Sequence, residues 1–146
     1  MPITINGSGT VTGISAGGLP DACITTDDIA ANAVTAAKLG ADQASGLAKA
    51  WVNFNGTGTV AIRASFNVSS ITDNGTGDYT INFTTALADA NYSIAGMVSH
   101  EGESSTEKSD IRIKHSIPPT TAAVRIQNEG RLALYDASFV NVAIFR

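Results

Sequence analysis

The sequence predicts a mainly β protein, in which a β-sandwich head of the jelly-roll type follows a short N-terminal segment. Apolar residues recur at every second position in several stretches after residue 48, and this is the period of a half-buried strand. Asn-Gly pairs separate some of these stretches, as they do in hairpins. Only 15% of the residues are charged. Turn signals recur about every 8–12 residues, which is typical of sandwiches.

The N-terminal segment, residues 1–48, is rich in Ala, Gly and Thr and nearly devoid of aromatic side chains. Its large apolar residues fall five positions apart, at Ile24, Ile29, Val34 and Leu39. Five is neither the helical nor the strand period. Short helical turns separated by bends would bury this stripe if they packed on copies of the same chain. A single helix from Asp27 to Leu39, stopped by Gly40, is the alternative.

The stretch FNGTGTVAIRASFNV, which begins at Phe54, contains the pattern G-x-G-x-x-A of dinucleotide-binding sites. Such a site needs a helix that begins within the glycines. From Val60 to Val68, apolar residues instead stand at every second position, as in a strand. Before the glycines, Val52 and Phe54 are also two positions apart and would lie on one face. We therefore predict a hairpin and no cofactor. Similar Asn-Gly turns follow Ile5 and Asp73.

The other strands of the head are predicted from the same alternation. YTINF places Tyr79, Ile81 and Phe83 on one face, and NYSIAGMVSH does the same from Tyr92 to Val98. The segments DIRIKH, AAVRIQ and RLALYD follow, with NEGR as the turn between the last two. SFVNVAIFR is apolar on both faces, which predicts a strand that is central in its sheet or covered by a neighbouring subunit.

The sequence shows no pattern typical of a catalytic or metal site. His100 and His115 flank EGESSTEKSD, but their spacing matches no ligand signature, and a solvated charged loop is favoured. Cys23 is the single cysteine and has no His nearby, so a free structural thiol is expected. Trp51 could stack on a sugar, although a lone Trp beside a strand is more typical of a core or an interface.

The composition argues against two classes of partner. The net charge of -4 does not favour binding to nucleic acid, which needs a basic face. No apolar run approaches the ~20 residues of a membrane helix, so no membrane insertion is expected. The first residues, MPITINGSGT, lack the features of an export signal.

Two stretches resemble proteins of tailed bacteriophages. ITINGSGTVTGISAGGLPDACITTDDIAANAVTAAKLG is similar to the N-terminal region of their small fibre proteins. AKAWVNFNGTGTVAIRASFNVSSITDNGTGDYTINFTTALADANYS is similar to a module of tail-fibre and host-attachment proteins. Together they cover about residues 2–98. The resemblance implies a homotrimeric virion protein, in which residues 1–48 form a stalk or attach to other virion proteins and residues 49–146 form the head.

The sequence patterns and the resemblance together predict which residues form trimer contacts and which bind the host. Trimer contacts are expected at Ile24, Ile29, Val34, Leu39, Val140, Val142 and Ile144. The host-binding loop is expected in the longest polar connection, with contacts from His100, Glu101, Glu103, Glu107, Lys108 and Asp110. The expected function is binding of a host-surface glycan or protein, strengthened by avidity. A purely structural virion part (head fibre, decoration protein or fibre connector) is the alternative, and a small glycan-degrading enzyme is a third reading.

Overall fold

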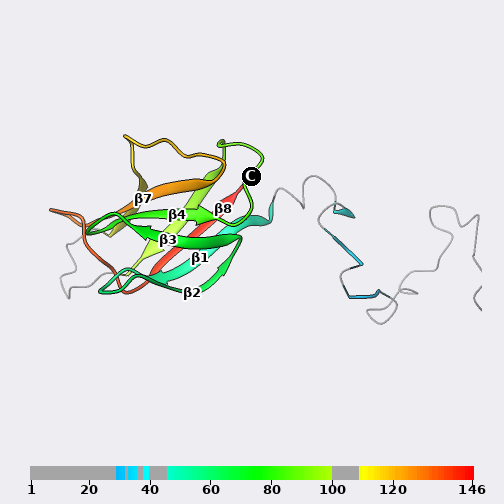
Figure 1. Cartoon of the computed structure of the whole chain (residues 1–146), viewed down its shortest axis with the longest axis horizontal. Coiled ribbons are helices and arrows are strands. Elements are labelled where there is room, and N and C mark those ends of the chain that lie inside the picture. The colour runs from blue at the N-terminus through cyan, green and yellow to red at the C-terminus, as the bar shows by residue number, and fades with distance from the viewer. Residues whose placement is uncertain (1–28, 32, 36–37, 40–45, 100–108) are drawn as a thin grey trace, which may run out of the picture. The chain divides into compact units, whose positions relative to one another are not determined.

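A computed structural model of the chain describes residues 29–31, 33–35, 38–39, 46–99 and 109–146 (Figure 1). The chain divides into two compact units, Met1–Leu39 and Gly40–Arg146. We call the second unit the head.

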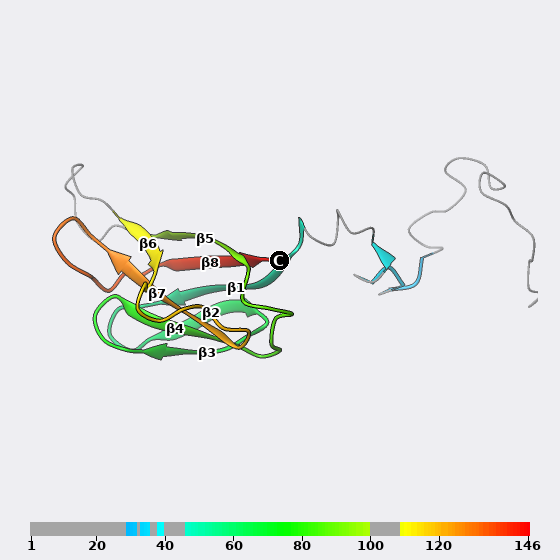
Figure 2. The same cartoon turned by 90° about the horizontal axis from the view of Figure 1, so that it is seen from above.

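The described part of the head forms eight strands. They are β1 (Ala48–Asn55), β2 (Ala61–Phe66), β3 (Val68–Asp73), β4 (Asp78–Phe83), β5 (Ser93–Val98), β6 (Asp110–Ile113), β7 (Ala123–Glu129) and β8 (Val140–Phe145). Sheet A has the order β2-β1-β8-β5 and sheet B the order β3-β4-β7-β6, and all pairs are antiparallel. Figures 1 and 2 show the two sheets stacked, with their strands crossing. The predicted mainly β class is confirmed, and a β-sandwich fits this arrangement.

The core lies between the sheets. It includes Val68, Leu87 and Ala137 but consists mainly of alternate residues of the central strands. These are Ala50, Val52 and Phe54 of β1, Tyr79, Ile81 and Phe83 of β4, Val124 and Ile126 of β7, and Val140, Val142 and Ile144 of β8. The rings of Phe54 and Tyr79 meet edge to face, with centroids 5.1 Å apart. Each large apolar side chain buried in this way contributes roughly 1.5–3 kcal/mol. The alternation predicted for β1 and β4 is confirmed.

Both hairpins predicted within the described residues are confirmed. β1 and β2 pair around a turn in which Gly58 has φ 63°, and the turn from β3 to β4 contains Gly75 at φ 121° and Gly77 at φ 63°. Asn55 closes the first turn, because its Nδ2 donates to the carbonyl oxygen of Thr57 (2.6 Å) and its Oδ1 accepts from the Thr57 hydroxyl (2.9 Å). A strand follows these glycines, so the pattern G-x-G-x-x-A serves a turn. The Asn-Gly after Ile5 lies outside the described residues.

The strand expected from Val60 to Val68 is interrupted at Asn67, whose φ is 54°. The chain passes here from β2 in sheet A to β3 in sheet B. The amide of Asn67 holds this corner by donating to the carbonyl oxygens of Lys49 (3.0 Å) and Thr85 (3.1 Å). β2, which is one of the two edge strands of sheet A, is exposed along its whole length rather than half-buried.

The strand expected at RLALYD is wrong. Residues 131–136 belong to the loop between β7 and β8, with a single bridge from Leu134 to Glu129. Side-chain contacts hold this loop, since Asp136 Oδ1 accepts from the backbone N–H of Gly77 (2.7 Å). The expectation of a central position for the last strand is confirmed, because β8 lies between β1 and β5.

Candidate functional site

The described residues of the first unit contain two single turns rather than one helix. The N–H of Ala33 donates to the carbonyl oxygen of Ala30, and that of Lys38 donates to the carbonyl oxygen of Thr35, each over 2.9 Å. The second turn follows the first after five residues, which is the spacing of the apolar stripe. This arrangement favours the interpretation as bent turns over the helix from Asp27 to Leu39.

The residues expected to contact other chains are found in different environments. In the first unit, Ile29 and Val34 are exposed and Leu39 is half-buried, while Ile24 lies outside the described residues. In the head, Val140, Val142 and Ile144 are at most 4% exposed. These three are core residues rather than surface contacts, because the alternation of β8 turns them toward sheet B.

The expected host-binding loop lies largely outside the described residues, which exclude His100, Glu101, Glu103, Glu107 and Lys108. Asp110 is described, and it is exposed at the start of β6 opposite Glu129. Within the described ranges, no group of three or more His, Cys, Asp or Glu could hold a metal ion. No helix among the same residues is long and apolar enough to cross a membrane.

The outer face of sheet A is apolar and exposed. Register places two rows of outward residues across its four strands: Phe66, Trp51, Ala143 and Ala95, then Ala64, Asn53, Asn141 and Met97. Phe139 precedes β8, and the Arg63 guanidinium lies over its ring, 4.3 Å from the centroid. Trp51, Phe66, Met97 and Phe139 are 39%, 54%, 76% and 51% exposed. We call these two rows with Phe139 and Arg63 the apolar face.

A shallow hollow of about 440 Å³ lies on the apolar face between Trp51 and Met97. Its polar lining comes mainly from Asn53 and Asn141, whose side chains are hydrogen-bonded to each other. One hydrogen bond, from Asn53 Nδ2 to Asn141 Oδ1, thus joins the two amides at the centre of an otherwise apolar surface. A surface of this kind suits contact with another apolar surface, since it holds few groups that could bond sugar hydroxyls.

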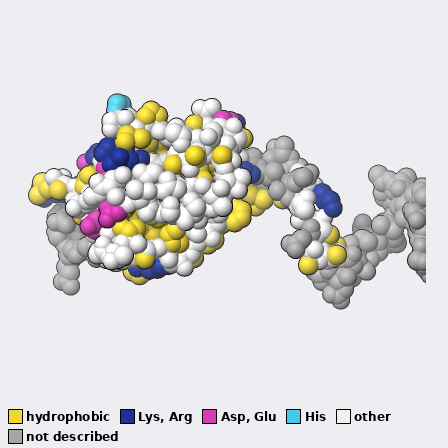
Figure 3. All heavy atoms as spheres, in the orientation of Figure 1, with side chains coloured by type: hydrophobic (Ala, Val, Ile, Leu, Met, Phe, Trp, Pro, Cys, Tyr) yellow, Lys and Arg dark blue, Asp and Glu magenta, His cyan; other side chains and the backbone are white. Residues whose placement is uncertain are grey.

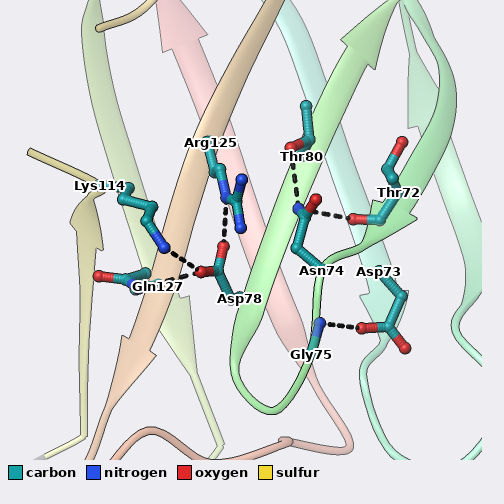
Figure 4. Close-up of polar contacts among 9 residues, drawn as sticks. All are labelled: Thr72, Asp73, Asn74, Gly75, Asp78, Thr80, Lys114, Arg125 and Gln127. Carbon is teal, nitrogen blue, oxygen red and sulfur yellow. Dashed lines mark hydrogen bonds and ion pairs between the residues drawn. The ribbon is translucent and has the colours of Figure 1, made fainter. Parts of the chain in front are cut away.

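The outer face of sheet B is polar, and it holds a buried carboxylate, Asp78, at the start of β4 (Figure 4). Asp78 Oδ1 accepts from Arg125 Nε over 2.6 Å. Its Oδ2 accepts from Lys114 Nζ over 2.6 Å and from Gln127 Nε2 over 3.1 Å. The hydrogen bond from Arg125, with help from Lys114 and Gln127, outweighs desolvation and lowers the pKa of Asp78 to about 2. A general acid for glycoside cleavage needs a raised pKa, so Asp78 does not suit that role.

Other polar side chains of sheet B are hydrogen-bonded to one another. Asn74 Nδ2 donates to the hydroxyl of Thr80 over 2.9 Å, and Asn82 Nδ2 donates to the hydroxyls of Ser70 (3.1 Å) and Thr72 (3.0 Å). In the view of Figure 3 the surface is mostly uncharged polar side chains and backbone, with Lys and Arg gathered near one end. The two sheets therefore present chemically different outer faces.

Comparisons with protein-family models, curated proteins and solved structures found no match. The two outer faces are therefore the features of the head from which its function can be argued. The sequence indicated parts of the apolar face, namely Trp51 and the second apolar face of SFVNVAIFR with Phe139 and Ala143, but not their combination with residues of β2 and β5. The sequence signal for this face is a set of large apolar residues, such as Met97 and Phe139, at the strand positions that alternate with the core positions. Alternation alone assigns such positions to solvent.

Proposed function

We propose that the chain is a homotrimeric fibre protein of a tailed bacteriophage that attaches the virion to the host surface. The resemblance of about residues 2–98 to phage fibre proteins supports the class. The main structural support is the repeated turn in the first unit. Ile29 and Val34 each directly precede one of the two turns and are exposed, so they are available for burial by other copies of the chain, which carry the same stripe. The N-terminal segment would join the virion and the head would face the host.

Light scattering should give a mass of three times the 15.0 kDa chain in dilute buffer. Replacing both Ile29 and Val34 with Asp should weaken the trimer at least a hundredfold, because each buried aliphatic side chain contributes roughly 2–5 kcal/mol. The matched control replaces Ala31 and Thr35 with Asp, since both are exposed and lie outside the apolar stripe. A monomeric wild-type chain at micromolar concentration would contradict the proposal.

The host-binding loop can be tested by replacing residues 101–108 with a Gly/Ser linker of equal length. The fold and the trimer mass should be unchanged, because loop changes cost little. Adsorption of phage to host cells should fall at least tenfold, since we place the receptor contacts in this loop. A Gly-Ser exchange of Arg131 and Leu132, in the loop between β7 and β8, is the control. Unchanged adsorption would place the receptor surface elsewhere.

A purely structural virion role is the second candidate. It is favoured by the outer face of sheet B, where Asp78, Asn74 and Asn82 are engaged with neighbouring side chains. Such a face is built for rigidity more than for ligand binding. The loop exchange separates the two roles: a structural part would leave adsorption intact, and its removal would instead reduce the yield of complete particles.

A further inference from the structure

The apolar face of sheet A is large enough to form part of a protein interface. Four strands of about six residues span roughly 20 Å by 20 Å. That footprint of the whole sheet is on the order of 400 Å², about half of the ~800 Å² that one partner contributes to a standard interface, so a contact here would add to contacts made elsewhere in the trimer. Trp51 lies on the inner strand β1 and Met97 on the edge strand β5, and aromatic residues and Met are enriched in interfaces.

The charge of the face indicates which partner it suits. None of the eight residues in its two rows is charged, and Arg63 at its margin lies on the ring of Phe139. Copies of the two uncharged rows can meet without like charges being placed opposite each other. A foreign partner that is selected by charge would find no complementary group in these rows. The composition therefore favours association of the face with its own copies.

We propose that the apolar face of sheet A packs against further copies of this chain, around the threefold axis of the trimer. This inference rests on the homotrimer proposed above and names the surface through which the heads touch. It assigns that contact to the outward residues of β1, β2, β5 and β8. Trp51 and Met97 become buried when the heads assemble.

Trp51 is the single tryptophan of the chain, so its fluorescence reports on this face. The quenching constant of Trp51 with acrylamide should be at least threefold lower in the wild-type trimer than in the variant Met97→Glu. Met97 is 76% exposed in one chain, so a charge here opposes contact between heads without entering the core. The control is Leu132→Glu, a similar exchange at a residue that is 92% exposed in the loop between β7 and β8. In this control, acrylamide should quench Trp51 as weakly as it does in the wild type.

The outcomes separate this inference from the proposed function. A wild-type trimer in which Trp51 is quenched as strongly as in Met97→Glu overturns the inference and leaves the homotrimer intact. A wild-type monomer overturns both. Protection of Trp51 that persists in diluted, monomeric protein shows that other residues of the same chain cover the face. Protection that appears only on adding host glycan assigns the face to sugar binding. Either of these last results also overturns the inference.

Discussion

Replacing Gly77 with Ala is expected to lower the free energy of unfolding of the head by about 3–4 kcal/mol. Gly77 has φ 63°, where a side chain costs roughly 1–2 kcal/mol. A Cβ at this position would also lie 2.7 Å from the backbone N and O of Tyr135 and 2.9 Å from the carbonyl oxygen of Asn128. These are backbone atoms, so the loop between β7 and β8 would have to move.

That movement would disturb a network that joins three connections at this end of the sandwich. The Gly77 N–H donates to Asp136 Oδ1, and the Tyr79 hydroxyl donates to the same oxygen over 2.6 Å. The Tyr79 hydroxyl also lies 3.0 Å from the carbonyl oxygen of Gly56, in the turn after β1. Burial, together with the nearby Asp136, raises the pKa of Tyr79 far above its usual range, so the hydroxyl stays protonated as a donor.

Gly58→Ala is the matched control, because Gly58 has the same φ of 63° but nothing within 4 Å of its Cβ position. Its cost should be about 1 kcal/mol, which is the backbone strain alone. Urea denaturation at one fixed protein concentration measures both variants, since the stability of an oligomer depends on concentration. Equal losses for the two variants would show that contact with the β7–β8 loop adds nothing at Gly77.

The inward residues of β1 and β4 could be predicted from sequence because strand alternation is a local signal. Val52, Phe54, Tyr79, Ile81 and Phe83 all point into the core. The hairpins were predictable for the same reason, since a tight turn depends on a few adjacent residues. β8 was predictable only in part. Its two apolar faces predicted either a central position or cover by a neighbouring subunit. Which face meets the core of its own chain depends on the packing of the sheets.

Features that depend on distant residues could not be predicted. The corner at Asn67 needs carbonyl groups of Lys49 and Thr85, each 18 residues away. The alternating run that spans Asn67 looks continuous, although it divides between two sheets. RLALYD alternates like a strand, yet contacts such as that of Asp136 with Gly77 hold it as a loop.

The two outer faces were hidden for a related reason. The rows of the apolar face combine four strands, and their order depends on a register that the sequence does not show. The charge cluster of Asp78 likewise draws Lys114 from beyond β6 and Arg125 from β7. The sequence around Asp78 therefore does not indicate that its partners are Lys114 and Arg125.

The Asp78 cluster should make the head sensitive to acid below pH 4. Its carboxyl pKa is about 2 in the folded chain and 3.8 ordinarily, so the folded state holds the charged form more strongly. The resulting stabilisation is fully present above about pH 4 and is lost as the pH falls toward 2. After allowance for partial screening by solvent it amounts to about 1–2 kcal/mol. The difference in unfolding free energy between wild type and Asp78→Asn should shrink over this range.

At pH 7, Asp78→Asn should cost about 2–3 kcal/mol, because Arg125 and Lys114 are left facing an uncharged amide. Their side chains are 20% and 26% exposed, so water offsets part of the loss and holds it below that of a fully buried pair. Glu129→Gln is the control. It breaks the pair with Arg112 on the same sheet, where the side chains are 40% and 49% exposed, and should cost less than about 1 kcal/mol. Urea denaturation at pH 7 and pH 2.5 measures both variants. If they lose equal stability at pH 7, burial adds nothing to the Asp78 pairs, and the acid sensitivity of the head must come from other carboxylates.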